Sequence, residues 1–184
     1  MDMRIRGKVT ALSQYFIDYF RVERLERGIS AKKLSIGIAP FEGETLVGQI
    51  EYEYSSAKYT STTLKKALNY FCLTMQDLLP DELLDDDQLI EKTRIPILKK
   101  MSVKAAFNSL IEEGFFDIPR LRSEITAYYN SFLEQEDHKE DTYFSAQLEE
   151  LCNEGKLLKL KDDDADDKKG KLIRFVRNKE LKED

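Results

Sequence analysis

The residues best suited to catalysis or metal binding are few and widely spaced in this chain. There are two cysteines, Cys72 and Cys152, and one histidine, His138. Zinc sites and nucleophilic triads need such groups at defined spacings, and none of the three has a partner nearby in sequence. Each cysteine falls within an apolar helical pattern, so we expect buried, reduced thiols. Phosphate-binding glycine loops, serine-hydrolase elbows and zinc-protease motifs are also missing, so we expect no enzyme, no cofactor and no metal.

A run of aspartates is the one segment that suggests a cation. Asp162, Asp164 and Asp166 alternate as at the start of an EF-hand loop. The glycine that this loop requires is replaced by Asp167, and its closing glutamate by Ile173. We therefore interpret the run as a solvated hairpin tip.

Composition and charge limit the classes of protein that remain. Of the 184 residues, 41% are hydrophobic and 35% are charged, as in ordinary globular proteins. No apolar stretch approaches the ~20 residues of a membrane span, and the N-terminus lacks the apolar core of a signal peptide. We expect a cytoplasmic protein without membrane contact. Residues 1–82 carry 11 basic and 11 acidic side chains and residues 83–184 carry 18 and 24, so the second part holds the whole net charge of −6.

Hydrophobic periodicity predicts five short helices in the first half. The first covers 10–27 and ends at Gly28, a typical left-handed residue after a helix. The others are predicted from Ser30 as N-cap through Leu34, over 45–51, from Thr63 onward, and from Thr74 until Pro80.

In the second half, three helices precede two strands. Helical patterns cover 102–113, 119–133 and 144–152, and a period of two follows in 156–160 and 171–176. The predicted organisation is a helical domain at 1–82, an acidic linker at 83–98, a second domain at 99–178 and a tail at 179–184.

Four segments of the first half share the pattern of a known family. They are Phe20-Arg21-x-x-Arg24-x-x-x-Gly28-Ile29-Ser30-x-x-x-Leu34-Ser35, Leu46-Val47-Gly48-Gln49-Ile50-Glu51, Leu64-x-x-Ala67-Leu68-x-x-Phe71 and Leu78-Leu79-Pro80. In these segments the chain resembles the Cro/repressor-like (XRE-type) helix-turn-helix regulators of bacteria, over about residues 9–80. The resemblance implies a mainly α fold that begins with a five-helix domain, whose third helix lies in the major groove of double-stranded DNA. It also implies a homodimer, because one such helix reads only a half-site.

The same resemblance implies a set of DNA-binding residues. They are Glu44, Thr45, Gln49, Ser55, Ser56, Lys58, Lys32 and Lys33. Thr45 and Gln49 would face the groove, and the serines with Lys58 would suit groove and backbone contacts. Glu44 replaces the glutamine or arginine that is common in the family, and it can accept from a cytosine amino group.

Other positions are expected to build the scaffold of the helix-turn-helix or to depart from it. Leu46, Val47 and Ile50 should be core residues. Arg21 and Arg24 should be solvated or paired with Glu51 or Glu23 rather than bound to phosphate. The connection 36–42 is longer than the usual tight turn and contains Pro40, so it could tilt the recognition helix.

The second half resembles winged-helix domains over about residues 99–178. The resemblance depends on the order of three helices and a β-hairpin, and on Gly155-x-Leu157-Leu158 at the entry to the hairpin. It implies an α+β domain. Because an acidic wing tip would be repelled by phosphate, we expect this domain to mediate dimerisation or to bind a protein partner.

Two functions therefore stay open. The first is a sequence-specific transcriptional regulator that binds DNA through its third helix. The second is a protein-interaction module, of the antirepressor or antitoxin kind, on a helix-turn-helix scaffold that has lost DNA binding. Glu42, Glu44 and the acidic second half motivate the second function.

Overall fold

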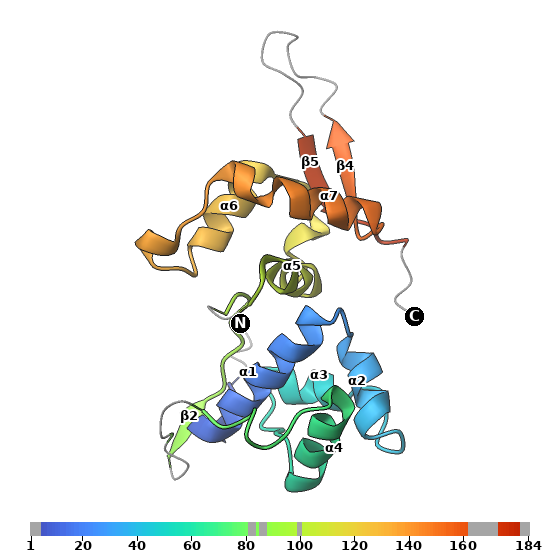
Figure 1. Cartoon of the computed structure of the whole chain (residues 1–184), viewed down its shortest axis with the longest axis vertical. Helices are drawn as coiled ribbons and strands as arrows, with labels where there is room; N and C mark the ends of the chain where they lie inside the picture. The colour runs from blue at the N-terminus through green and yellow to red at the C-terminus, as the bar shows by residue number, and fades with distance from the viewer. Residues whose placement is uncertain (1–4, 81–83, 85–87, 99–100, 162–172, 181–184) are drawn as a thin grey trace. The chain divides into compact units, whose positions relative to one another are not determined.

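The computed structural model describes residues 5–80, 84, 88–98, 101–161 and 173–180 (Figure 1). Within these residues the fold is mixed α and β, with seven α-helices and two small sheets. The chain divides into two compact units, Met1–Ile95 and Pro96–Asp184, here called unit 1 and unit 2.

Four α-helices form the body of unit 1. They are α1 (Ala11–Glu26), α2 (Ala31–Ile38), α3 (Leu46–Glu51) and α4 (Ser61–Phe71). Local side-chain caps start three of them. Thr10 accepts from the Ser13 N–H, Ser30 accepts from the Lys33 N–H, and Thr60 forms a capping box with Thr63. The predicted stop at Gly28 is confirmed by its φ of 63°.

The core of unit 1 surrounds an aromatic cluster. The ring of Phe20 lies 5.0 Å from that of Tyr59 and 6.0 Å from that of Phe71, between ring centroids. Val47 and Ile50 of α3 are fully buried in the same cluster, and Leu46 packs against it, as predicted. This burial leaves the opposite side of α3 at the surface.

The predicted fifth helix does not form. Residues 75–78 make a turn, in which the N–H groups of Leu78 and Leu79 reach only three residues back, to Met75 and Gln76. Pro80 then lacks the N–H that another helical turn would need. Unit 1 therefore has four described helices rather than five.

The prediction of a buried Cys72 is wrong. Cys72 caps the end of α4 in the left-handed conformation, with φ 56°, and its side chain is exposed. The apolar stripe of the helix ends one residue earlier, at Phe71, so the reversal of the chain turns the thiol outward. Cys152 is half-buried, and both cysteines are free thiols.

A two-stranded sheet changes the interpretation of the predicted linker at 83–98. Strand β1 (Lys8–Thr10) pairs antiparallel with β2 (Leu89–Glu91), and Val9 lies opposite Ile90. The segment from Leu89 to Ile95 thus belongs to unit 1, and residues 81–83 and 85–87 lie outside the described part of the chain.

Unit 2 combines three helices with a three-stranded sheet. Its elements are α5 (Val103–Glu112), β3 (Arg120–Leu121), α6 (Arg122–Asn130), α7 (Ser145–Asn153), β4 (Leu157–Lys161) and β5 (Ile173–Arg177). The antiparallel sheet has the order β3-β5-β4, and Figure 1 shows β4 and β5 side by side. The core contains Phe107, Phe116 and Phe144, all fully buried.

Two differences from the prediction concern unit 2. Helix α6 begins at Arg122 rather than Pro119, because Arg120 and Leu121 pair with β5. This short strand adds to the predicted hairpin. The aspartate run at the predicted wing tip lies outside the described residues, and so does the end of the predicted tail, after residue 180.

Candidate nucleic-acid interface

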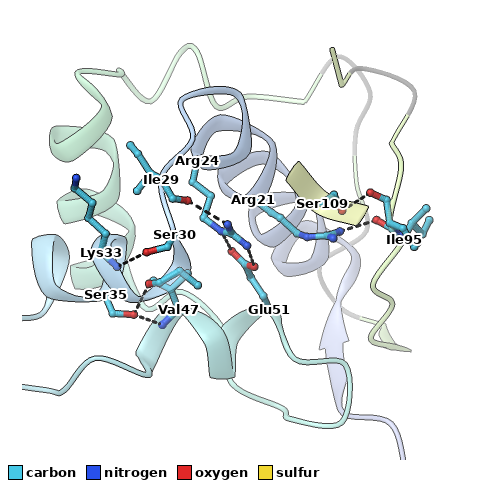
Figure 2. A network of polar contacts seen from close by, with 12 residues as sticks. Arg21, Arg24, Ile29, Ser30, Lys33, Ser35, Val47, Glu51, Ile95 and Ser109 are labelled. Atoms are coloured by element: carbon cyan, nitrogen blue, oxygen red, sulfur yellow. Dashed lines mark hydrogen bonds and ion pairs between the residues drawn. The ribbon is translucent and has the colours of Figure 1, made fainter. Parts of the chain in front are cut away.

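A buried ion pair fixes α3 to α1. The Nε and Nη2 atoms of Arg24 donate to the two carboxylate oxygens of Glu51, at 2.6 and 2.5 Å (Figure 2). Both side chains are buried, with 0% and 1% of their surface exposed. Arg24 also donates to the carbonyl of Ile29 in the turn before α2. The prediction that Arg24 is paired, with Glu51 as one named partner, is thus confirmed.

A serine of α2 fixes the other end of α3. The Oγ atom of Ser35 accepts from the N–H of Val47 at 2.9 Å and donates to the carbonyl of Ala31 at 2.8 Å (Figure 2). N–H groups in the first turn of a helix have no partner within the helix. Thr45, the N-cap residue, makes no side-chain cap, so Ser35 supplies the acceptor from the neighbouring helix. These contacts fix the direction in which α3 presents its exposed side.

That exposed side carries the predicted groove-facing residues. Thr45 and Gln49 are exposed and four residues apart, so they lie on one side of α3. Glu44 precedes them, and its Oε2 atom pairs with the Nζ atom of Lys32 at 2.9 Å. This exposed pair offsets the negative charge that Glu44 would otherwise bring next to Thr45. Lys33, one residue further along α2, is exposed.

The remaining predicted residues lie in the loop at 52–60, between α3 and α4. Lys58 is exposed, whereas the Ser55 hydroxyl accepts from the Ala57 N–H at 3.1 Å. The Ser56 hydroxyl accepts a long bond, 3.4 Å, from the N–H of Lys8 in β1. The two serine hydroxyls are therefore engaged within the protein, and Lys58 is the loop's exposed cation.

Lys92 contacts this loop from the interior of unit 1. It was not among the predicted site residues. Its side chain is fully buried, and its Nζ atom donates to the carbonyls of Ser55 and Ala57 at 3.1 and 2.8 Å. Burial lowers the pKa of Lys92 to about 8, against the opposing effect of the Glu51 and Asp18 carboxylates. In sequence Lys92 follows an acidic stretch and gives no sign of burial.

Gly7 lies directly under the same loop. Its N–H donates to the carbonyl of Glu53 at 2.9 Å, and its carbonyl accepts from the N–H of Lys92 at 2.7 Å. A Cβ atom at this position would lie 2.3 Å from the carbonyl oxygen of Ser55, closer than real Cβ atoms approach. Only glycine allows the two backbones to come so close.

Polar side chains of α1 bind the segment after Lys92. The amide of Gln14 exchanges hydrogen bonds with the backbone of Thr93, at 3.0 and 3.2 Å. The Nη1 atom of Arg21 donates to the carbonyl of Ile95 at 2.6 Å (Figure 2). Gln14 also donates to Asp18, whose pKa burial raises to about 6.

Exposed aromatic side chains lie near both ends of α3 in sequence. They were not among the predicted site residues. Phe41, in the lengthened turn before α3, is fully exposed. Tyr52 and Tyr54 follow α3, are partly exposed at 41% and 37%, and have ring centroids 5.5 Å apart. They are the exposed aromatic residues of the described part of unit 1, and all three lie close in sequence to an end of α3.

Among the described residues, no three His, Cys, Asp or Glu side chains are grouped so that they could hold a metal ion. No described helix is both long enough and apolar enough to span a bilayer. Comparison with models of known families, with curated proteins and with solved structures finds no match.

Proposed function

We propose that the chain is a sequence-specific DNA-binding regulator of the helix-turn-helix type, in which α3 reads the major groove. One observation carries the proposal: the exposed Thr45 and Gln49 lie on a helix whose other side is locked by Arg24–Glu51 and Ser35–Val47. Direct readout needs side chains held in a fixed direction, because hydrogen bonds to base edges tolerate little displacement. Hydroxyl and amide groups are suitable donors and acceptors for base edges.

Selection of bound duplexes from a random DNA pool at low salt tests the proposal. We expect an enriched motif, with two half-sites if the protein binds as a dimer. The double variant Thr45→Ala/Gln49→Ala should no longer discriminate between bases at the positions that those residues read. Each bidentate side-chain–base contact that is lost should reduce the discrimination by about 1–3 kcal/mol. The matched control is Thr62→Ala/Gln76→Ala, which removes an exposed threonine and an exposed glutamine elsewhere in unit 1. Failure to enrich any duplex would contradict the proposal.

Unit 2 is assigned to dimerisation or to a protein partner. Its α7 carries Glu149 and Glu150, which pair with Lys159 and Lys104 and so neutralise two cations that could otherwise bind phosphate. Sedimentation of the full chain tests the assignment. If unit 2 forms the dimer contact, substitutions on its surface should dissociate the dimer while unit 1 is left intact.

The alternative is a protein-interaction module that does not bind DNA. Phe41, fully exposed beside Glu42 and near Glu44, favours it, because an exposed aromatic ring among carboxylates suits a basic partner surface. The same selection distinguishes the two functions. The second function is supported if the protein enriches no duplex at low salt but binds a protein partner, and if Phe41→Ala abolishes that binding.

A further inference from the structure

The loop at 52–60 has little structure of its own to hold it. It contains no helix or strand. Hydrogen bonds within it include one from the Ser55 N–H to the Tyr52 carbonyl and one from the Ala57 N–H to the Ser55 hydroxyl. Gly7 and Lys92, which are far away in sequence, form hydrogen bonds with its backbone at Glu53, Ser55 and Ala57, and Tyr59 packs the end of the loop into the core.

Burial of the Lys92 ammonium group costs free energy. A fully buried ammonium group loses its hydration, and the lowered pKa of Lys92 reflects this loss. An apolar side chain of similar length would fill the same space without that loss. What an apolar side chain cannot do is donate to two carbonyls of one loop at the same time.

We infer that Lys92 is a positioning residue for DNA binding, which holds the 52–60 loop so that Lys58 meets the phosphate backbone. The inference rests on the proposed function. The carbonyls of Ser55 and Ala57 flank Ser56, and Ala57 directly precedes Lys58, so two hydrogen bonds from a single Nζ atom fix the backbone that leads to Lys58. Gly7 has no side chain, so its backbone packs directly against that of Ser55 and adds a second contact to the same part of the loop.

A positioning role and a merely structural role predict opposite results for Lys92→Met. Methionine fills the volume and removes the cost of burying a charge, which offsets the loss of the two hydrogen bonds, so the variant should lose little stability. The two carbonyls then lose their donor and must turn to water, which moves the loop. Stability is therefore retained while DNA binding falls, a combination that a merely structural role does not produce.

The experiment is a double-mutant cycle in the full chain between Lys92→Met and Lys58→Ala, with affinity for the selected duplex measured over a range of salt concentrations. For each bound protomer, removal of one cation from the phosphate backbone makes the log–log salt slope shallower by about 0.9 and lowers affinity about eightfold at 0.1 M salt. Each single variant should show this loss, and the double variant should show no more than either one. The selected sequence should not change, because Thr45 and Gln49 are untouched.

Three further variants test the explanation. Gly7→Ala, which displaces the same loop by a different route, should reproduce the effect, whereas Lys92→Arg should restore most of the binding because it keeps a cationic donor. Lys179→Met is the matched control for loss of one lysine at an exposed position in unit 2, and it should leave the slope unchanged. Amide hydrogen exchange of the free protein should be faster at 55–58 in Lys92→Met and in Gly7→Ala, and unchanged in Lys179→Met.

The outcomes separate the inference from the proposed function. If the wild type binds duplex but Lys92→Met keeps the full slope, or if its effect adds to that of Lys58→Ala, the inference is wrong and the proposed function stands. If Lys92→Met does not fold, additivity of Gly7→Ala with Lys58→Ala overturns it equally. If no duplex is bound, the proposed function fails, and the inference fails with it, even where hydrogen exchange shows that Lys92 orders the loop.

Discussion

Single side chains fix the orientation of α3, Ser35 at its start and Arg24 at its end. Arg24 and Glu51 form two short hydrogen bonds with almost no exposed surface. Both charges have lost their hydration, so each depends on the other. The pair therefore adds less to net stability than its distances suggest, and it has a strong effect on the orientation of α3.

The dependence of the two charges can be measured. Arg24→Met should destabilise the protein by about 3–5 kcal/mol in denaturant unfolding, because Glu51 is left charged and buried. The double variant Arg24→Met/Glu51→Leu should recover much of that loss. Recovery of stability without recovery of duplex binding would show that the pair is retained for orientation, whereas equal losses in the single and double variants would contradict the argument.

The exposed pair of Lys32 and Glu44 is expected to behave differently. Because both side chains are more than half exposed, Lys32→Met should change the free energy of unfolding by less than about 1 kcal/mol. It should nevertheless weaken duplex binding, since it leaves the Glu44 carboxylate without its cation next to the groove-facing residues. Glu44→Gln in the Lys32→Met background should restore affinity in a titration with the selected duplex, and Lys139→Met serves as the control for charge loss.

At the scale of the element, α3 shows what tertiary contacts add to a weak local preference. Its six residues are too few for a helix that is stable alone. The pattern of Leu46, Val47 and Ile50 was nevertheless enough to predict it, because its apolar side follows helical spacing. Ser30 and Gly28 were predicted equally well, since caps and stops are local signals.

Other elements could not be predicted, because their causes are not local. Strands β1 and β2 have three residues each and lie about 80 residues apart, so neither shows a recognisable alternation. The contacts of Lys92 with Ser55 and Ala57 join positions more than 30 residues apart. The predicted site therefore included the loop that holds Lys58 but omitted Gly7 and Lys92, the residues beneath it.

The polar side of α1 gives a prediction for pH. Burial raises the pKa of Asp18 to about 6, so the folded protein binds a proton more readily than the unfolded chain. This contribution to stability is complete below about pH 4 and is lost as the pH rises through 6. The stability difference between Asp18→Asn and the wild type should therefore shift in favour of the variant by up to about 3 kcal/mol from pH 3.5 to 7. Thermal unfolding at several pH values measures it, and a constant difference would contradict the raised pKa.

At the scale of the whole molecule, unit 1 extends further along the chain than its helices do. The sequence predicted a boundary near residue 82, where the acidic stretch begins. The structure places Leu89 to Ile95 in unit 1, through pairing with β1 and through Gln14 and Arg21. Acidic composition predicts exposure on average, and it gave no information on the backbone contacts made by this segment.

Truncation tests that boundary. A chain of residues 1–95 should unfold cooperatively, whereas a chain of residues 1–82 should be less stable by about 3–6 kcal/mol. The shorter chain loses β2 and the bonds at Lys92, Thr93 and Ile95, each worth about 1 kcal/mol. Circular dichroism melting of the two fragments provides the comparison, and equal melting temperatures would show that the segment is not part of the folded unit.

The order of contacts along this segment has a mechanical consequence. Tension applied to the chain from beyond residue 95 meets the Arg21–Ile95 bond first, then the paired bonds between Gln14 and Thr93, and only then Lys92. The first two connections rupture one after the other before any force reaches Lys92 and the loop that carries Lys58. A force too small to break them therefore leaves this loop in place.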